Sequence, residues 1–382
     1  MRDPASYISR RALGVDASGI RKVFDLAAKM KDPINLSIGL PDFDVPDAVK
    51  EAAIESIRRG DNRYTQTQGI APLRERLRHD LSTEFGRDVG EVLITSGVSG
   101  GLLLAILSII DPGDEAVFLD PYFVMYKHLL TVAGGKAVTV DSYPDFRFHA
   151  DRVEKVITKR TKMLMLNSPS NPTGMVLSEA EVRSAVELAK KHDLLLLSDE
   201  IYEPFLYDTK RAAGSGQQAV QDLYSPASIY EKTLVLRGFS KSHAMTGWRL
   251  GYAAGPAEII SQMTKLQQYT FVCAPSPLQV AAVTAMNVSM KEAVDAYRRK
   301  RDIVYDKLSK KFELVRPAGA FYIFPQAPAG ISATDFVTKA IEHNVLIIPG
   351  NVFSERDTHF RISYATTDEK LIQGCEILNS MV

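Results

Sequence analysis

The sequence predicts an α/β protein with a mostly parallel sheet covered by helices on both faces. Strand-like and helix-like patterns alternate between about residues 91 and 255. The strand-like runs, such as TKMLMLN (161–167), are almost continuously apolar, which is typical of strands buried on both faces. The 382 residues, 45% hydrophobic and 24% charged, have an ordinary globular composition and can bury a large core.

The N-terminal elements come before this alternation. Residues 17–30 have the spacing of a helix, and INLSIGLPDFD (34–44) predicts a short strand that runs into a Gly/Pro turn. Helices are expected at 46–60, where Pro46 suits the start of a helix, and at 71–85.

The alternating region supplies most of the predicted sheet. A strand followed by a turn is expected over 91–97, and further strands are expected at 114–120, 136–141, 161–167, 193–199, 232–237 and 249–255. Helices are expected at 99–110 and 178–192, and a turn followed by a helix is expected over 121–135. The stretch AAGSGQQAVQDLYSPAS (212–228) is expected to be an exposed excursion between two elements.

The C-terminal third predicts a separate α+β unit. A long helical stretch (256–312) leads out of the alternating region, and four strand-like pieces follow: FELVRP, AFYIFP, VLIIPG and HFRISYA. The segment before about residue 45 is expected to pack with this unit. The predicted division is therefore a large domain over 46–285 and a small domain built from 1–45 and 286–382.

Charge and composition disfavour several classes of protein. A formal net charge of zero gives no electrostatic reason to expect binding to nucleic acid or to an anionic membrane. The N-terminus has no apolar signal-peptide segment, and GLLLAILSII (101–110) is too short to span a bilayer. Cys273 and Cys375 predict two reduced thiols in a cytoplasmic protein, with a single disulfide as the alternative. No Cys/His cluster has structural-zinc spacing, so no metal is expected.

Polar side chains follow five of the apolar runs, at the points where the strands end. Ligands bind beyond the carboxyl ends of parallel strands, so these side chains predict one shared site. They are Ser96 to Ser99, Asp120 to Phe123, Asn167 and Asn171, Ser198 to Tyr202, and Gly238 to Lys241.

Two of these groups have a specific chemical interpretation and a plain alternative. Residues 97–99 precede a helix, where backbone N–H groups suit a phosphate, although a simple Ser N-cap would also explain them. Asp199 ends a strand of four leucines and would be costly to bury without a partner. It therefore either pairs with a buried cation, or it or Ser198 caps a helix.

Lys241 and Arg249 lie just past a predicted buried strand. One interpretation is a surface lysine and a structural arginine. The other is a reactive amine whose pKa is lowered by burial and by a nearby cation.

Several longer stretches together resemble the fold-type I, pyridoxal 5′-phosphate (PLP) dependent aminotransferases of class I/II. They are NSPSNPTG (167–174), SDEIYEPF (198–205), GFSKSHAMTGWRLGY (238–252), GAFYIFP (319–325) and RISYAT (361–366). The resemblance covers nearly the whole chain, and within the family it is strongest to aspartate and aromatic-amino-acid aminotransferases. It implies a large domain with a mostly parallel seven-stranded sheet, a smaller α+β domain, a PLP cofactor and a homodimer.

The resemblance also implies roles for individual residues. Lys241 matches the lysine that forms the Schiff base, and Asp199 matches the acid that pairs with the pyridine nitrogen. Asn171 and Tyr202 match the residues that hydrogen-bond the 3-oxygen of the ring, and Phe123 matches the aromatic stacked on the ring.

The remaining roles concern the phosphate and the substrate. The implied phosphate ligands are Gly97, Val98, Ser99, Ser240 and Arg249. Tyr64 matches a tyrosine that reaches the phosphate from the other subunit. Arg361 matches the arginine that grips the substrate α-carboxylate, assisted by Asn171, and Gly39 matches a glycine whose backbone approaches the substrate.

The expected reaction is transfer of the amino group of an L-amino acid, aspartate or aromatic, to a 2-oxo acid such as 2-oxoglutarate, by a ping-pong mechanism through the Lys241 Schiff base. Phe123 stands where many aspartate-specific members have Trp, and no second arginine for a distal carboxylate is identified, which argues against strict dicarboxylate specificity. The alternative on the same fold is a PLP-dependent C–S β-lyase or other elimination enzyme. A nucleotide-binding α/β protein is disfavoured because no G-x-G-x-x-G follows a strand.

Overall fold

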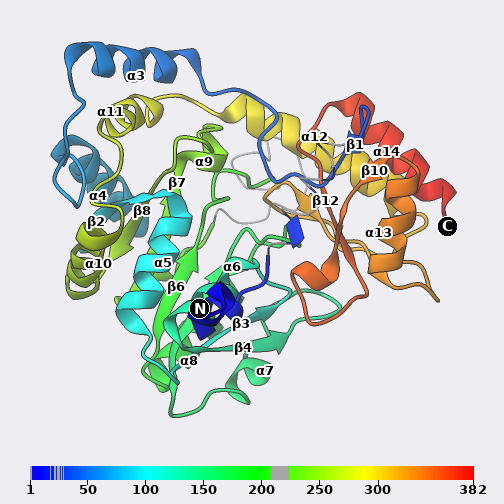
Figure 1. The fold of residues 1–382 in the computed structure, drawn as a ribbon, viewed down its shortest axis with the longest axis horizontal. Helices are drawn as coiled ribbons and strands as arrows, with labels where there is room; N and C mark the ends of the chain where they lie inside the picture. Colours follow the sequence, from blue (N-terminus) through cyan, green and yellow to red (C-terminus); the bar gives the residue numbers. More distant parts are fainter. Residues whose placement is uncertain are drawn as a thin grey trace.

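A seven-stranded sheet forms the centre of the protein, and helices cover both of its faces (Figure 1). The computed structural model describes residues 2–17, 19–20, 23, 26, 28, 30–207 and 223–382. Beside the large sheet lies a second group of short strands and helices from the C-terminal third of the chain (Figure 1). The predicted α/β class is confirmed.

The large sheet is parallel except for one strand. Its strands are β2 (Glu91–Ser96), β3 (Glu115–Asp120), β4 (Lys136–Asp141), β5 (Thr161–Asn167), β6 (Leu195–Asp199), β7 (Thr233–Gly238) and β8 (Leu250–Gly255). Their order in space is β2-β8-β7-β6-β5-β3-β4. Only β8 runs antiparallel to its neighbours, β2 and β7, within these seven strands. The prediction of a mostly parallel seven-stranded sheet is therefore confirmed.

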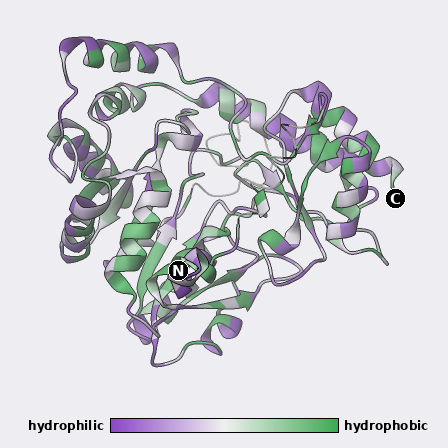
Figure 2. Cartoon of the chain, in the orientation of Figure 1, coloured by the Kyte–Doolittle hydropathy of each residue, from purple (hydrophilic) through white to green (hydrophobic). Residues whose placement is uncertain are grey.

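The central strands are almost continuously apolar because both faces of the sheet are buried there. On β5, Met163 and Met165 belong to the core on one face, whereas Leu164 and Leu166 belong to the core on the other. The first face is covered by α5 (Gly97–Ile109), α6 (Met125–Ala133) and α10 (Ala257–Thr270), and the second by α7 (Ala150–Glu154) and α8 (Glu179–Lys191). Figure 2 shows the hydrophobic residues concentrated in these central strands and in α5.

A further helical layer packs at the β2 end of the sheet. It consists of α3 (Asp47–Arg59), α4 (Ala71–Phe85) and α11 (Ser276–Ala285). Leu73, Leu77 and Leu81 recur every four residues on α4 and form its buried stripe. Helix α3 begins after Pro46 and ends at Gly60, whose φ of 96° is a left-handed conformation that glycine adopts readily.

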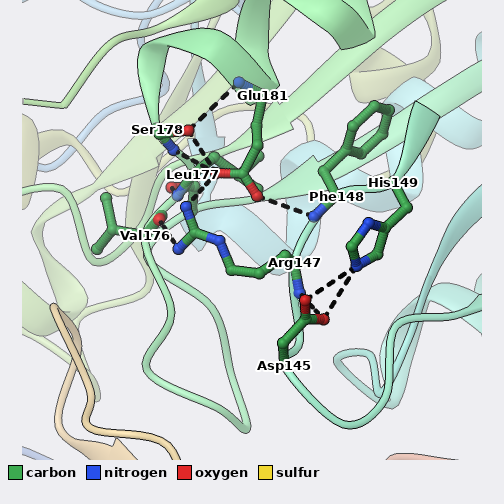
Figure 3. Close-up of polar contacts among 9 residues, drawn as sticks. Asp145, Arg147, Phe148, His149, Val176, Leu177, Ser178 and Glu181 are labelled. Carbon is green, nitrogen blue, oxygen red and sulfur yellow. Dashed lines mark hydrogen bonds and ion pairs between the residues drawn. The ribbon is translucent and has the colours of Figure 1, made fainter.

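The start of α8 is fixed by a small polar cluster (Figure 3). Ser178 and Glu181 form a capping box, in which each side chain accepts a hydrogen bond from the backbone of the other. Glu181 also accepts hydrogen bonds from Arg147 and from the backbone N–H of Phe148, and Arg147 donates to the carbonyl of Val176 (Figure 3). This cluster anchors the loop that joins β5 to α8, which carries the NPTG motif.

The C-terminal third and the segment around residue 34 share backbone pairing. Strand β1 (Ile34–Asn35) pairs in parallel with β10 (Val345–Leu346). A three-stranded antiparallel sheet contains β11 (Ile348–Pro349), β12 (Phe360–Ser363) and β9 (Tyr322–Ile323). The longer helices of this C-terminal third are α12 (Lys291–Leu308), α13 (Ala333–Glu342) and α14 (Asp368–Ser380). The other short helices in the described residues are η1 (Pro4–Tyr7), α1 (Arg10–Leu13), η2 (Pro226–Ser228), α9 (Phe239–Ser242) and η3 (Gly350–Val352).

Two sequence predictions are wrong in detail. The helical stretch at 256–312 is three helices, α10, α11 and α12. The break between α10 and α11 occurs where Val272 adopts a left-handed φ of 65° and Pro275 cannot continue the helix before it. FELVRP forms no strand, because a single backbone hydrogen bond, from Gln326 N to Glu313 O, joins it to a neighbouring extended segment in the described chain, and one bond does not make a ladder. Much of the helix predicted at 17–30, and most of the excursion predicted at 212–228, lie outside the described residues.

Cys273 and Cys375 are both free, as the first of the two sequence interpretations predicted. No helix in the described part of the chain is long and apolar enough to cross a membrane.

Candidate active site

A cavity of about 490 Å³ lies at the carboxyl edge of the large sheet, where β5, β6 and β7 end and where β9 and β12 approach it. Ligand cavities in enzymes commonly have this size. The predicted site residues that line it are Gly39, Val98, Ser99, Phe123, Asn171, Asp199, Tyr202, Ser240, Lys241, Arg249 and Arg361. The structure therefore brings together nearly all of the residues that the strand-end pattern and the family motifs had identified.

Lys241 lies on α9, the short helix that begins where β7 ends. Its Nζ donates a hydrogen bond of 2.6 Å to the carbonyl oxygen of Gly39. Burial lowers the pKa of Lys241 to about 8, and the positive charges of Arg361 and then Arg249 contribute to this shift. The surface-lysine interpretation is wrong, because the amine faces the cavity and is partly neutral near physiological pH.

Asp199 ends β6 and is almost completely buried. Burial raises the pKa of its carboxyl to about 6, and hydrogen bonds from Tyr126 Oη (2.6 Å to Oδ2) and Ile201 N (3.3 Å to Oδ1) oppose that rise. Turn residues rather than a helix follow β6 in the described segment up to residue 207. The helix-cap interpretation of Asp199 is therefore wrong.

The first turn of α5 forms an anion-binding geometry. Ser96 is the N-cap residue, but its side chain makes no capping hydrogen bond, so it does not satisfy the backbone N–H groups of that turn. Gly97 has a φ of 65°, and a Cβ there would lie 2.7 Å from Arg249 Nη2. The guanidinium of Arg249 thus packs directly on the helix start, and Nη1 is held by the carbonyl of Thr246 at 2.9 Å.

Arg361 on β12 is buried on the other side of the cavity. Its Nη1 donates to Asn171 Oδ1 (3.0 Å) and its Nη2 to the carbonyl of Ser37 (2.6 Å). The guanidinium carbon lies 4.5 Å from the ring centre of Tyr322 and 4.7 Å from that of Phe353. These contacts fix the plane of the guanidinium, and burial lowers its pKa.

The remaining predicted residues differ in placement. Phe123 lines the cavity and packs edge-on against Tyr126, with ring centres 5.7 Å apart. Ser240 is buried beside Lys241 at the same edge. Tyr64 is 84% exposed and does not line this cavity, which is compatible with a role in a neighbouring subunit.

Sequence reasoning missed Tyr126, Tyr322 and Ser37. Tyr322 lies inside the GAFYIFP motif and its hydroxyl is 2.8 Å from that of Tyr202. Tyr126 lies in the first turn of α6, three residues beyond Phe123, which precedes that helix. A buried tyrosine usually needs a polar partner for its hydroxyl, but this rule applies only once the burial of both residues is known from the structure. Ser37 acts through its carbonyl, so its side chain carried no signal.

Comparison with known proteins agrees with the geometry. The family model for aminotransferase class I and II matches residues 31–378. The chain is 36% identical over 386 residues to a probable aspartate aminotransferase of Methanocaldococcus jannaschii, which covers 98% of this chain and 99% of the relative. It is 36% identical over 392 residues to aromatic-amino-acid aminotransferase 2 of Thermococcus litoralis, with 98% of each chain covered.

A solved structure shares the complete fold. Aspartate aminotransferase of Thermus thermophilus with maleate has a TM-score of 0.90 to this chain at 34% identity, and the match covers 100% of both chains. These relationships favour transamination over the elimination chemistry that the sequence had left open. The chain belongs to the class I and II aminotransferases, a family of fold-type I PLP-dependent enzymes, and it is an aminotransferase.

Proposed function

We propose that this aminotransferase holds PLP in the cavity around Lys241 and transfers the amino group of an L-amino acid, aspartate or aromatic, to a 2-oxo acid, with 2-oxoglutarate as the expected acceptor. The observation that carries the proposal is the convergence on one cavity of an amine of lowered pKa, a buried carboxylate and an uncapped helix start beside an arginine.

This set of groups fits the polar parts of PLP. The first turn of α5, with Arg249 and Ser240, suits a phosphate dianion. Asp199 suits a protonated pyridine nitrogen, since a buried carboxylate favours a cationic hydrogen-bond donor. Lys241 suits the aldehyde carbon, because a neutral amine is the nucleophile for that bond.

PLP, when bound, supplies an electron sink for the bonds at the substrate Cα. The protein supplies the positioning and the proton transfer. Lys241 Nζ, once free, would accept the proton from Cα and return it, and a pKa near 8 suits this exchange at neutral pH. Asp199 would keep the ring nitrogen protonated, and Tyr202 and Asn171 would donate hydrogen bonds to the ring oxygen.

Arg361 would bind the α-carboxylate common to all amino acid and oxo acid substrates. Each Nη atom carries two N–H groups, so the bonds to Asn171 and Ser37 leave donors for a bidentate contact. Because the guanidinium is fixed between two rings, the bound carboxylate would be fixed as well. The Cα–H bond would then be directed toward Lys241.

The preferred amino donor depends on the other residues that line the cavity. Phe123, Ile20, Ile38 and Leu40 give the cavity apolar walls that suit an aromatic side chain. The relatives include both an aspartate and an aromatic-amino-acid aminotransferase, and the Thermus enzyme was solved with maleate. Both donor classes therefore belong in the proposal.

We also infer a cytoplasmic homodimer in which Tyr64 of each subunit reaches the cavity of the other. The support is the exposure of this phenol ring, which lies outside the cavity of its own chain, and the two free thiols, which suit a reducing compartment.

We infer the domain division 46–285 against 1–45 with 286–382. The parallel pairing of β1 with β10 supports it.

The test begins with cofactor binding. The purified protein, offered PLP, should develop a visible absorption band, and borohydride reduction followed by peptide mass analysis should place the added mass on Lys241. A panel of amino donors against 2-oxoglutarate, measured as kcat/KM, then identifies the substrate. A protein that binds no PLP would refute the proposal. Release of pyruvate and ammonia from a β-substituted alanine without any acceptor would point to elimination instead.

A further inference from the structure

Two buried tyrosine hydroxyls meet at the wall of the cavity. Tyr202 follows β6 and Tyr322 lies on β9, 120 residues later, and their Oη atoms are 2.8 Å apart. Their rings are almost perpendicular, with centres 5.5 Å apart. Both residues are more than nine-tenths buried and both line the cavity. In the described part of the chain, neither hydroxyl has a second hydrogen-bond partner.

The position of Tyr322 is fixed from three directions. It pairs in register with Ser363 of the neighbouring strand β12. The guanidinium of Arg361 stacks on its ring at 4.5 Å. Its hydroxyl occupies the space beside Gly39, where an added Cβ would lie only 2.2 Å from Tyr322 Oη. Tyr322 therefore offers Tyr202 a hydroxyl whose place is set by the fold and not by the ligand.

The hydrogens decide what this pair can do. Either hydroxyl can donate to the other, but each has only one hydrogen to donate. If Tyr202 donates to Tyr322, it presents only lone pairs to the cavity and would repel an anionic ring oxygen. If Tyr322 donates to Tyr202, the hydrogen of Tyr202 is free to point at that oxygen.

We propose that Tyr322 is a positioning residue that donates its hydroxyl hydrogen to Tyr202 Oη and so directs the hydrogen of Tyr202 toward the ring oxygen of the bound cofactor. This inference rests on the proposed function. It adds a role for a residue that does not itself touch the reacting atoms.

The charges around the pair keep both phenols neutral. Burial raises the pKa of both tyrosines above its ordinary value. At Tyr202, the neighbouring Tyr322 and then Asp199 at the end of β6 add to this rise, and Arg361 on β12 opposes it at both tyrosines. Lys241 on α9 lines the same cavity, and its Nζ donates to the carbonyl of Gly39, the residue beside Tyr322 Oη. Both hydroxyls therefore retain their hydrogens at any working pH, as the proposed arrangement requires.

The test is the substitution Tyr322→Phe, which keeps the ring stacked on Arg361 and removes one donor. Without the hydrogen bond that Tyr322 donates to it, the Tyr202 hydroxyl becomes a weaker donor and stabilises the anionic ring oxygen less. The bound cofactor therefore holds its proton more tightly. The pH midpoint of the visible absorption change of the holoenzyme should rise by about 0.4 to 1 unit, the equivalent of one hydrogen bond. Tyr202→Phe should produce a larger rise.

The double variant Tyr202→Phe/Tyr322→Phe distinguishes positioning from a general structural effect. If Tyr322 acts through Tyr202, adding Tyr322→Phe to Tyr202→Phe should shift the midpoint no further. The matched control is Tyr230→Phe, which also removes a buried 2.8 Å hydrogen bond, to the carbonyl of Leu194, but away from the cavity. This control should leave the midpoint unchanged.

Each outcome has one meaning. No shift in Tyr322→Phe, or the same shift in both backgrounds, would overturn the positioning role while leaving PLP binding and transamination intact. An unmodified protein that shows no cofactor band at all would instead refute the proposed function.

Discussion

Replacing Arg361 with lysine should lower kcat/KM by a similar factor for every amino acid and oxo acid substrate. The structure holds the guanidinium in one plane, between the rings of Tyr322 and Phe353, with hydrogen bonds to Asn171 and to the carbonyl of Ser37. Lysine retains the positive charge but has no planar fork, so it can offer a carboxylate one well-directed hydrogen bond in place of two.

The expected loss follows from the missing bond. A hydrogen bond to a charged group contributes about 1.5 to 3 kcal/mol, which corresponds to a loss of roughly 10- to 150-fold in kcat/KM. The α-carboxylate is common to donors and acceptors, and both use this site in turn in a ping-pong mechanism. The loss should therefore be similar for an aromatic donor, for aspartate and for the oxo acid, measured separately as single half-reactions.

The control is Arg301→Lys, which changes another buried arginine that donates to the carbonyl of Pro317 and stacks on Tyr207, outside the cavity lining. It should leave kcat/KM unchanged. If Arg361→Lys retained full activity, or lost activity toward one donor only, the assignment of Arg361 to the α-carboxylate would be wrong.

The other predictions concern the remaining charges. The rate at which the apoenzyme attaches PLP should rise with pH and level off above about 8, because Lys241 reacts only as the neutral amine, and stopped-flow absorbance would show it. Lys241→Ala should abolish transamination, whereas Arg249→Ala should mainly weaken cofactor retention, measured by dialysis. Arg237→Met would leave Glu200 buried without its ion-pair partner and should lower the free energy of unfolding by about 3 to 5 kcal/mol in urea titration. The same change at Arg76, whose side chain is 41% exposed in its ion pair with Asp80, should cost less than about 1 kcal/mol.

Local sequence patterns were sufficient to predict the large sheet. Its strands are short apolar runs with clear turn residues between them, and the central ones are buried on both faces, so burial and pattern agree there; the edge strand β4 is only partly buried. Strand β8 shows the limit. RLGYAAG predicts a strand, but no local feature states that it lies between β2 and β7 and runs antiparallel to both.

Some residues of the candidate site could be predicted from local sequence, whereas others depend on contacts between distant parts of the chain. Asp199 and Lys241 could be predicted because each is a charged group directly after an apolar strand, where burial without a function would be costly. Tyr126 and Tyr322 could not, because their roles arise from contacts made 73 and 120 residues away along the chain. The hydroxyl of a tyrosine in a hydrophobic motif carries no sequence signal of its partner.

The charges of the cavity also explain how one lysine can serve as both nucleophile and base. Arg361 and Arg249 lower the pKa of Lys241 only to the extent that their own charges are uncompensated. Arg361 contributes more than Arg249, and in the proposed reaction it is the arginine that a substrate carboxylate neutralises. Binding a substrate should therefore weaken the repulsion on Lys241 and make its amine more basic. That change would occur at the stage when the lysine must accept a proton, so the carboxylate site would also act as an electrostatic control on the base.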